Sequence, residues 1–371
     1  MKYKAYNLSD VHTASAQNKF NVISTFAGGG GSSTGYRLAG GKILCINEFV
    51  EEAQETYRKN YPDTPILTDD IKDLTGKEFL EYGNDIDILD GSPPCSAFSV
   101  SGAMVQGSHS DGWNKTKKYS DGKVIENIED LFFDFLRIAN VIRPKVIVAE
   151  NVKGLTIGEA KQYYSKITNE FENIGYDVSS KVLNSAHYGV PQTRQRVIFI
   201  GVREDVTEKI GLTFMNIASL FPDENNDFVN IADMLDGLPY DEKEVKELTE
   251  KFATTSHYAT ASKMPSDPDK VLTGCDYHEK GHHFNMKRCS RFKPAPTITA
   301  TGGAVHWTEL RNLTIMELKR IMSLPDDFIL TGTRKQQAER CGRMVPSLMM
   351  KAIADSVYEK VLKPYKELTN G

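Results

Sequence analysis

Cysteine is scarce in this sequence and never stands at metal-binding spacing. The 371 residues include five cysteines, an odd number, and no Cys-x-x-Cys pair. This pattern argues against a disulfide framework and against a structural zinc site. Three neighbouring histidines, His278, His282 and His283, have no cysteine pair beside them. We therefore expect no bound metal, and we expect the cysteines to be free thiols.

Long apolar runs are missing as well. No stretch approaches the roughly 20 apolar residues that span a bilayer, and residues 1–20 lack the apolar segment of a signal peptide. We expect a cytoplasmic protein without a membrane partner.

Neither sign of charge dominates. The formal net charge is −5 at pH 7, with 40% apolar and 26% charged residues. This is an ordinary globular composition, and the length suffices for one large domain and a smaller one. A basic face can sit on an acidic molecule, so the charge neither requires nor excludes a nucleic-acid partner.

Residues 21–203 alternate between β-rich apolar segments and longer amphipathic ones. The apolar segments predict strands at 21–26, 42–47, 85–90, 145–150, 180–184 and 196–202. The amphipathic segments predict helices at 50–61, 129–142 and 161–175. This order is typical of an α/β fold with a mostly parallel sheet and helices on both faces. In such sheets ligands lie beyond the carboxyl ends of the strands, so we look for chemistry in the loops that follow them.

Four of these strands are followed by residues suited to binding or catalysis. Gly28–Gly31 follows the first strand, Glu48 ends the second, Cys95 follows the third, and Glu150 with Asn151 ends the fourth. An acid about 20 residues after a glycine turn is where dinucleotide-binding folds bind ribose. Taken singly, the glycines could form a plain tight turn and Glu150 could be a solvated or capping carboxylate. Their convergence on one sheet edge favours a common site.

The segment before Cys95 singles out its thiol. A free cysteine is usually a small buried hydrophobic residue. Here Gly91, Pro93 and Pro94 fix the backbone and give the sulfur a defined direction, which a space-filling residue does not need. Glu150 stands behind the apolar "VIVA", and this indicates partial burial, which favours a protonated carboxyl.

Eight motifs follow one another along the chain. They read "FAGGGGSSTGYRLAG", "NEF", "DDI", "SPPCSAFSVSG", "ENVKGL", "PQTRQRVIFIGVR", "RNLTIMELKRIMSLPDDF" and "GRMVPSLMMKAIADSV". In this order they resemble the cytosine-C5 DNA methyltransferase family of the prokaryotic or phage type. The resemblance covers nearly the whole chain except about 205–290. It implies a Rossmann-like S-adenosylmethionine-dependent methyltransferase fold with a smaller target-recognition domain.

The resemblance implies a covalent mechanism. Carbon 5 of cytosine is a poor nucleophile, so a thiolate must first add to carbon 6 and turn the ring into an enamine. Cys95 would supply the thiolate, Glu150 would share a proton with N3, and Arg196 would hold O2. Arg194 would support the site or contact backbone phosphates. Two solvated arginines at a strand edge are the alternative interpretation of the last pair.

The resemblance also implies S-adenosylmethionine as the cofactor. Phe26 and the glycine backbone would lie along its methionine part, Glu48 on the ribose and Pro94 at the methyl end. The full set of implied cofactor residues is Phe26, Ala27, Gly28, Gly30, Gly31, Glu48, Phe49, Asp70, Ile71, Pro94, Arg343 and Val345.

Double-stranded DNA is the implied partner. A stacked base cannot enter such a site, so the cytosine would be flipped out of the duplex. The Gly- and Ser-rich segment 101–122 would be a mobile loop that closes over it, with Trp113 as a wedge; a surface loop of no function is the alternative. The predicted DNA contacts are Ser99, Trp113, Lys115, Asn151, Lys287, Arg288, Arg291 and Lys293.

The regular alternation stops after Glu204, and this suggests domain boundaries. We predict a catalytic and cofactor-binding domain at 1–204, a target-recognition domain with hinge at 205–310, and a hinge helix with a return to the first domain at 311–371. The last segment should form an amphipathic helix opened by Pro346 and docked on the sheet. Its apolar stripe consists of Met349, Ile353, Val357 and Val361.

One position departs from the family. In "CGRMVP", Arg343 stands where the family usually has asparagine, close to the methionine end of the cofactor. A second cation near a sulfonium calls for an anion. That anion could be the cofactor's own carboxylate, a phosphate or a nearby glutamate. It could also be an extra carboxylate on the transferred group, in which case the cofactor is carboxy-S-adenosylmethionine and the product 5-carboxymethylcytosine.

Two further functions stay open. A branch of the family methylates cytosine in tRNA through the same motifs, and a catalytically dead methyltransferase could serve as a DNA-binding protein. The sequence suggests a restriction-modification or DNA-protection enzyme that acts as a monomer, with a cognate restriction endonuclease as a further partner. It does not give the recognised bases.

Overall fold

The computed structural model describes residues 2–94, 116–118, 124–126, 130–158, 160–213, 216–300 and 304–370. The chain divides into two compact units. Unit 1 comprises Met1–Asp10, Asn184–Arg194 and Glu224–Met349, and unit 2 comprises Val11–Leu183, Gln195–Asp223 and Met350–Gly371. The assignment of 1–204, 205–310 and 311–371 to separate tasks stays a prediction.

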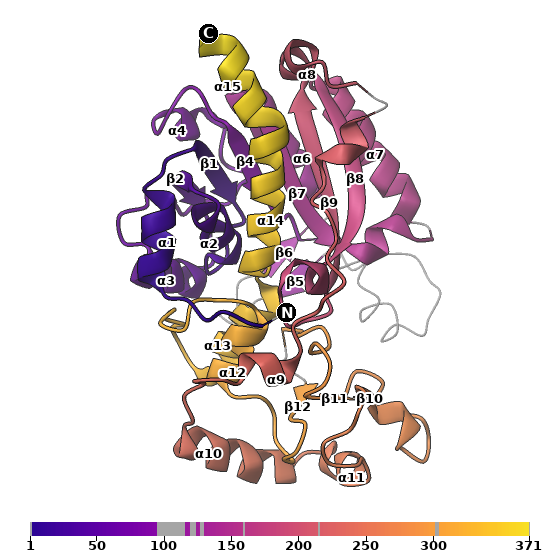
Figure 1. Cartoon of the computed structure of the whole chain (residues 1–371). Coiled ribbons are helices and arrows are strands. Elements are labelled where there is room, and N and C mark those ends of the chain that lie inside the picture. Colours follow the sequence, from indigo (N-terminus) through magenta and orange to yellow (C-terminus); the bar gives the residue numbers. More distant parts are fainter. Residues whose placement is uncertain are drawn as a thin grey trace. The chain divides into compact units, whose positions relative to one another are not determined.

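Unit 2 is built on a seven-stranded sheet in the order β3-β2-β1-β4-β7-β9-β8 (Figure 1). The strands are β1 Phe20–Thr25, β2 Gly41–Asn47, β3 Ile66–Leu67, β4 Ile88–Gly91, β7 Val146–Val152, β8 Tyr176–Asn184 and β9 Gln195–Arg203. Strands β3, β2, β1, β4 and β7 pair in parallel, whereas β9 runs antiparallel to β7. The predicted α/β fold with a mostly parallel sheet is confirmed.

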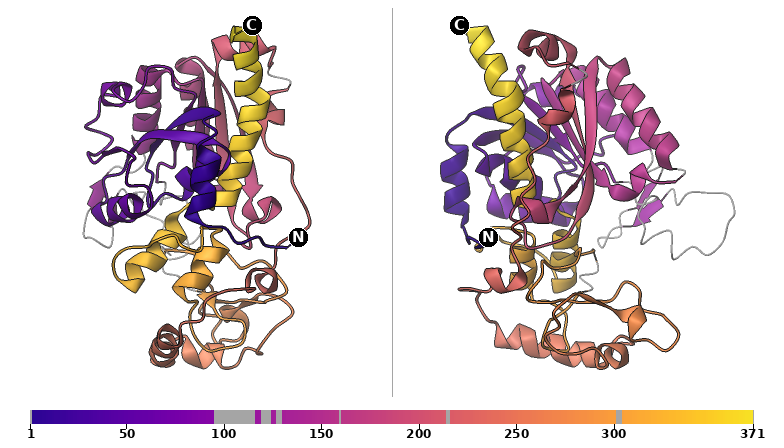
Figure 2. Two further views of the ribbon diagram at one scale, coloured as in Figure 1. Left: turned by 60° about the vertical axis from the view of Figure 1, so that its left-hand side comes forward. Right: turned by 45° about the vertical axis from the view of Figure 1, so that its right-hand side comes forward.

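Helices cover both faces of this sheet. In Figure 1, α6 and α7 lie behind it and the C-terminal helices α14 and α15 cross its front; Figure 2 shows the same arrangement from two other sides. The helices are α1 Leu8–Ser15, α2 Gly31–Leu38, α3 Glu51–Asn60, α4 Lys77–Leu80, α6 Leu131–Ile142, α7 Ala160–Asn173, α8 Glu204–Ile210, α14 Ser347–Val357 and α15 Lys363–Asn370. Shorter turns are the 3₁₀ helices η3 Lys153–Thr156 and η5 Ile217–Leu220 and the π-helix η7 Tyr358–Leu362.

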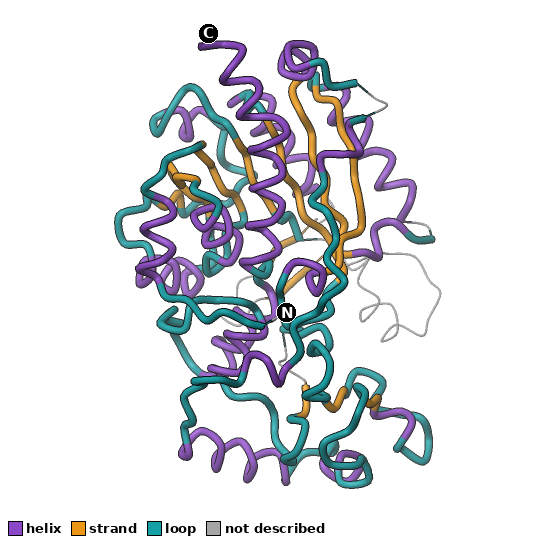
Figure 3. Tube along the Cα trace, viewed as in Figure 1, coloured by secondary structure: helices purple, strands orange, loops and turns teal. Residues whose placement is uncertain are grey.

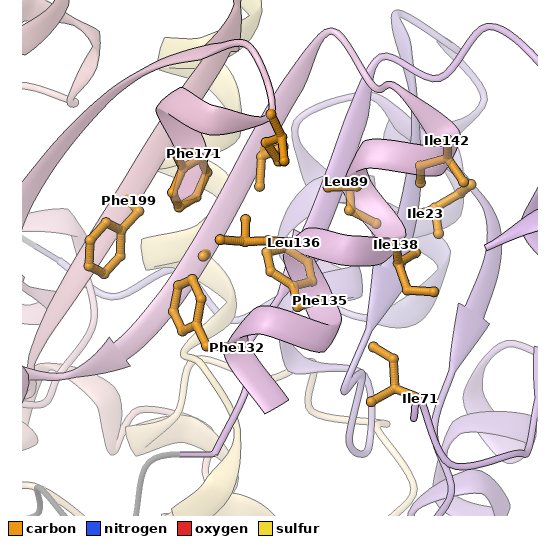
Figure 4. Close-up of a cluster of buried hydrophobic side chains, with 14 of the residues drawn as sticks. Ile23, Ile71, Leu89, Phe132, Phe135, Leu136, Ile138, Ile142, Phe171 and Phe199 are labelled. Carbon is orange, nitrogen blue, oxygen red and sulfur yellow. The ribbon is translucent and has the colours of Figure 1, made fainter. Parts of the chain in front are cut away.

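Aromatic side chains fill the core between the sheet and α6 and α7. Phe132, Phe135 and Leu136 recur at helical spacing on α6 and are fully buried. The rings of Phe171 and Phe199 stack at 6.1 Å, and Phe132 meets Phe199 edge-on at 5.6 Å (Figure 4). This packing makes the strands rigid supports for the loops at their ends.

The C-terminal helix packs as its apolar stripe predicts. Helix α14 begins at Ser347, directly after Pro346, and Met349, Ile353, Val357 and Val361 are all fully buried. Lys366 Nζ on α15 donates to the Lys19 backbone oxygen and to Asp87 in unit 2. In the described part of the chain, no helix is both long and apolar enough to cross a membrane.

Unit 1 is dominated by loops, which are teal in Figure 3. Its small sheet has the order β10-β11-β12, and its own core includes Phe252, Met264 and Met286. Its elements are η4 Ser185–Tyr188, α9 Ile231–Met234, α10 Glu242–Ala253, α11 Tyr258–Ala261, β10 Leu272–Thr273, η6 Gly274–Asp276, β11 Lys287–Arg288, β12 Ala304–Val305, α12 Ile315–Ile321 and α13 Arg334–Arg343.

Candidate active site

The glycine loop after β1 takes backbone conformations that suit a ligand cradle. Gly28 and Gly30 have φ of +56° and +103°, and Phe26 has φ of +51°, which phenylalanine rarely adopts. A methyl group on Gly28 would meet no atom within 4 Å, so its backbone borders open space. A methyl group on Gly30 would press on the Tyr57 ring at 3.2 Å. Gly28 thus offers backbone to a ligand, and Gly30 permits the packing behind it.

Glu48 closes the other side of this loop. Its Oε2 accepts a hydrogen bond from Gly28 N at 2.7 Å, and its Oε1 accepts one from Val50 N at 2.8 Å. The side chain of Glu48 is fixed at the end of β2 with only 7% of its surface exposed. A carboxylate held in this way beside a glycine turn suits ribose hydroxyls, as the spacing predicts.

The turn that carries Asp70 and Ile71 is fastened from two sides. Asn47 Nδ2 donates to the backbone oxygens of Leu67 and Asp69. Arg137 Nη2 on α6 donates to Ile71 O at 3.0 Å. Sequence reasoning missed both residues: Asn47 stands in the motif "NEF" but was given no role, and Arg137 belongs to no motif. They position the turn that carries two of the implied cofactor residues.

The Pro-Pro segment after β4 is tied to its neighbours. Ser92 Oγ donates to Phe26 O at 3.4 Å, and Asn151 Nδ2 donates to Pro93 O at 3.2 Å. Asn151 is 2% exposed, and its Oδ1 accepts from Val152 N. This buried position does not suit the DNA contact predicted for Asn151, which instead holds the segment that leads to Cys95.

Several predicted site residues lie outside the described residues, namely Cys95, Ser99, Trp113 and Lys115. Most of the predicted loop 101–122 lies outside them as well. The described part of that loop is β5 Thr116–Lys118, which pairs antiparallel with β6 Val124–Glu126 just beyond it. The roles of these residues stay predictions.

Glu150 and Arg196 form an ion pair. Their strands β7 and β9 place Val152 opposite Arg196, so Glu150, two residues earlier, faces the same side of the sheet. Arg196 Nε lies 2.8 Å from Glu150 Oε1, with 15% and 11% of the two side chains exposed. The partial burial expected for Glu150 is confirmed. The guanidinium and the carboxyl group thus satisfy one another until a substrate separates the pair.

Asp90 is a site residue that sequence reasoning missed. It stands at the end of β4, five residues before Cys95, and is 3% exposed. Its Oδ2 accepts from Ser24 Oγ at 2.7 Å and its Oδ1 accepts from Tyr36 OH at 3.1 Å. An acid at the carboxyl end of an apolar strand is the signal that singled out Glu48 and Glu150, and the same signal could have found Asp90.

Arg194 is structural. It is 3% exposed and donates to Ile298 O at 3.0 Å and to Gly342 O at 3.1 Å, all within unit 1. The predicted support of the site is compatible with this position, but contact with DNA phosphates is not. Nearby, Gln192 Oε1 accepts from Ile298 N at 3.0 Å.

At Gly342, helix α13 packs directly against the backbone of Thr299 and Ala300. A methyl group there would lie 2.2 Å from Thr299 O. We predict that Gly342→Ala destabilises the protein by about 3 kcal/mol, because backbone cannot yield as a side chain can. Chemical denaturation of the variant checks this, and an unchanged midpoint would contradict it. Gly211→Ala is the control for the loss of a glycine without a steric clash: its added methyl meets open space, so that only the cost of a left-handed backbone at φ +68° remains.

Arg343 has an anion on its own helix. Its Nη2 lies 2.7 Å from Glu339 Oε1, four residues earlier on α13, and its Nε donates to the same oxygen at 2.8 Å. The nearby glutamate considered for this cation is therefore present. Val345, two residues on, is buried.

The basic cluster of unit 1 is only partly exposed. Arg288 is 2% exposed and donates to four backbone oxygens, those of Ala261, Met264, Trp307 and Thr308. It therefore does not suit the predicted DNA contact. Lys287 Nζ donates to Thr273 Oγ1 and lies over the Phe284 ring. Arg291 pairs with Asp267 at 2.8 Å, and Lys293 is exposed. Arg291 and Lys293 keep surface positions that DNA could reach.

The residues of the glycine loop fit the predicted cofactor. Open space at Gly28, the fixed carboxylate of Glu48 and the fastened Asp70 turn follow three adjacent strands of one parallel sheet. A nucleoside with a charged amino-acid tail suits this combination of open backbone and fixed acid.

The chain matches one family model along most of its length. The model, C-5 cytosine-specific DNA methylase, matches residues 20–359. The chain is 29% identical over 347 residues to the Type II methyltransferase M1.HphI of Haemophilus parahaemolyticus, covering 90% of this chain and 86% of the relative. It is 30% identical over 368 residues to the Type II methyltransferase M.NgoFVII of Neisseria gonorrhoeae, covering 94% and 90%.

The chain also resembles solved structures in its fold. A prophage-encoded DNA modification methyltransferase of E. coli has a TM-score of 0.68 at 21% identity, covering 93% of this chain and 99% of that one. A DNMT2 variant of Spodoptera frugiperda has a TM-score of 0.60 at 17% identity, covering 93% and 99%. At these identities the likeness concerns the fold alone.

Proposed function

The chain belongs to the C-5 cytosine-specific DNA methylases, and from this premise we propose that it methylates carbon 5 of a flipped-out cytosine in duplex DNA through a covalent Cys95 adduct. The observation that carries the proposal is the ion pair of Glu150 and Arg196, whose side chains lie 2.8 Å apart. The pair stands at the edge of the sheet where β4 ends and the Pro-Pro segment begins. An acid and a fork of N–H donors in one place match the N3 and O2 edge of cytosine.

The protein's residues divide the chemistry between them. The Cys95 thiolate forms a bond to carbon 6 with its lone pair, and the π electron pair of the carbon 5–carbon 6 double bond moves through carbon 5 toward the ring's N3 and O2. Arg196 donates to O2, and Glu150, once it has taken up a proton, shares that proton with N3. Carbon 5 then attacks the methyl group, a base removes the proton from carbon 5, and elimination restores the Cys95 thiolate. The Glu150–Arg196 pair must therefore open when the base enters.

S-adenosylmethionine is the proposed cofactor, and when bound it supplies an electrophilic methyl on a sulfonium. Glu48 would bind the ribose hydroxyls, Gly28 would face the methionine part, and the Asp70 turn would lie at the adenine. Pro94, fixed through Pro93 and Asn151, would line the methyl end. These residues orient the cofactor and exclude water without taking a proton from it.

DNA is the proposed polymer rather than RNA. The sequence relatives reported above are named as Type II methyltransferases, and a restriction-modification role in the cytoplasm of a bacterial or phage-infected cell follows from that kinship. We propose a monomer, because one flipped base needs one pocket. Incubation with duplex DNA and with folded tRNA distinguishes the two polymers. Methylation of tRNA alone would overturn the assignment.

A second donor is considered because of Arg343. An S-adenosylmethionine with a carboxylate on the transferred group could use this arginine as its anchor, and the product would be 5-carboxymethylcytosine. The Glu339 carboxylate at 2.7 Å already neutralises Arg343, so we propose the ordinary donor.

A cofactor competition tests this choice. With an equal mixture of the two donors, we expect nucleoside mass spectrometry of the DNA to give 5-methylcytosine alone. We further expect Arg343→Asn to leave methylation within about threefold, since one ion pair on a helix contributes little. A 5-carboxymethylcytosine peak that disappears in Arg343→Asn would establish the carboxylated donor instead.

The covalent adduct has its own test. Duplex DNA with 5-fluorocytosine in place of cytosine should trap the protein in a complex that survives denaturing electrophoresis, and only when S-adenosylmethionine is present. The absence of both this complex and 5-methylcytosine would favour a non-catalytic DNA-binding protein.

A further inference from the structure

Asp90 is a buried carboxyl group that the proposed chemistry does not use. It is the register partner of Ser24 on β1, and Val148 on β7 is its partner on the other side. Glu150 lies two residues beyond Val148 and thus faces the same side of the sheet as Asp90. Tyr36 reaches Asp90 from α2. Asp90 therefore links the strand that leads to the predicted nucleophile, of which it is part, with the helix that follows the glycine loop.

The contacts of Asp90 join two loops that must meet. Strand β4 continues through the Pro-Pro segment toward Cys95, and α2 begins at Gly31, where the glycine loop ends. Ser24 Oγ and Tyr36 OH each donate to one oxygen of the carboxyl group, and Thr25 Oγ1 donates to the Asp90 backbone oxygen at 3.1 Å. A shift of Asp90 would move both loops.

The surroundings of Asp90 make its charge depend on the pH near neutrality. Burial raises the pKa of Asp90 to about 7, against the hydrogen bonds from Ser24 and Tyr36, which lower it, and the charge of Glu150 raises it as well. Burial and the Asp90 charge raise the pKa of Tyr36 well above its usual value, so Tyr36 stays a donor. Among the described residues, Tyr36 from α2 and Glu150 from β7 are the titratable groups that act on it; Ser24 from β1 is uncharged.

We propose that Asp90 is a positioning residue that holds the Pro-Pro segment in register with the glycine loop, and that the ionised carboxylate holds the two together most firmly. This inference rests on the proposed function, which it deepens. Nothing in it requires Asp90 to touch substrate or cofactor.

The direction of the effect follows from charge. Ionised Asp90 accepts both hydrogen bonds as they stand, whereas protonated Asp90 must turn one hydroxyl round and loosens the link. The active form should be the one with Asp90 ionised.

Asp90→Asn tests the proposal because asparagine has the same shape and no charge. We would measure single-turnover formation of 5-methylcytosine in unmethylated plasmid DNA between pH 6 and 8.5. The ratio of the wild-type rate to the variant rate should rise from near 1 at pH 6 to about 10 at pH 8, with a midpoint near 7. Ionisation of Cys95 cancels in this ratio. A ratio that does not change with pH would mean that Asp90 is merely structural, and would overturn the inference.

Thermal unfolding gives a second readout. The folded pKa of Asp90 lies above its unfolded value, so its burial is free of penalty at low pH and costs stability as pH rises toward and past 7. The melting temperature of Asp90→Asn, relative to that of the wild type, should therefore rise between pH 5 and pH 8. Equal pH dependence of the two proteins would contradict a charge that depends on the pH.

Tyr36→Phe decides the matter if Asp90→Asn fails to fold. Loss of this donor removes a hydrogen bond that favours ionised Asp90. The pH midpoint of the transfer rate should therefore move upward, and at high pH the rate should still approach the maximal rate of the wild type. An unmoved midpoint would overturn the inference. A wild-type protein that forms no 5-methylcytosine at any pH would instead overturn the proposed function on which it rests.

Discussion

Replacement of Cys95 by alanine is expected to lower the single-turnover rate of 5-methylcytosine formation roughly ten-thousandfold or more. Without addition at carbon 6, carbon 5 has no enamine character and cannot attack the methyl group. The remaining residues can still bind the base and cofactor, so their affinities should change little. Nucleoside mass spectrometry after a single turnover measures the rate, and isothermal titration measures cofactor binding.

A second cysteine provides the matched control. Cys275 in unit 1 is a partly exposed free thiol, and Cys275→Ala should keep full activity and full trapping by 5-fluorocytosine DNA. The buried thiols are poorer controls, because burial raises the pKa of Cys45 and of Cys289 to about 12 and their loss would leave cavities. A Cys95→Ala protein that retains a tenth of the wild-type rate would refute covalent catalysis by this residue.

Glu150→Gln is expected to reduce the transfer rate by roughly a hundredfold to ten-thousandfold. Glutamine keeps the size of the side chain and can offer an N–H to N3, but it cannot take up and return a proton. It also replaces the carboxylate that lies 2.8 Å from Arg196 with a neutral amide. The loss should fall on the rate and on 5-fluorocytosine trapping rather than on cofactor affinity. A variant that loses cofactor binding to the same extent would point to a structural role.

A double-mutant cycle shows whether the pair acts as a unit. If Glu150 and Arg196 hold the same ring, Arg196→Ala should lower the transfer rate much less in the Glu150→Gln background than in the wild type. The loss that remains there should be only that of the residual contact between Arg196 and the base. Losses that simply multiply would mean that the two residues act separately. Lys153→Ala is a suitable reference, since its ammonium is nearby on η3 and bonds Gln195 Oε1, outside the pair.

The central strands of the sheet could be predicted from the sequence because they are buried on both faces. Val146–Val152 and Gln195–Arg203 read as apolar runs for that reason, and their predicted bounds are within two residues of the observed ones. Strands β10 to β12 were not predicted. Each has only two residues, too few for any periodicity, and they form through contacts between distant segments.

The site could be predicted where residue type implies chemistry, and not where burial decides the role. Glu150 and Arg196 were singled out as reactive groups, and the structure pairs them. Arg288 and Asn151 have the residue types of DNA contacts, yet tertiary packing turns both inward to hold backbone oxygens. Charge and hydrogen-bonding capacity are visible in a sequence, but the partner that satisfies them depends on which segments meet.

The division of the chain into two units has a consequence for its modularity. The chain passes from one unit to the other after residues 10, 183, 194, 223 and 349. No single cut or fusion point can therefore yield either unit as a separate polypeptide. A transfer of most of unit 1 from a relative, in evolution or in the laboratory, would have to replace an internal segment such as 224–349 with both of its ends fixed. Arg194 and Arg196 stand on opposite sides of one such passage, so a splice there would divide a motif of the active site.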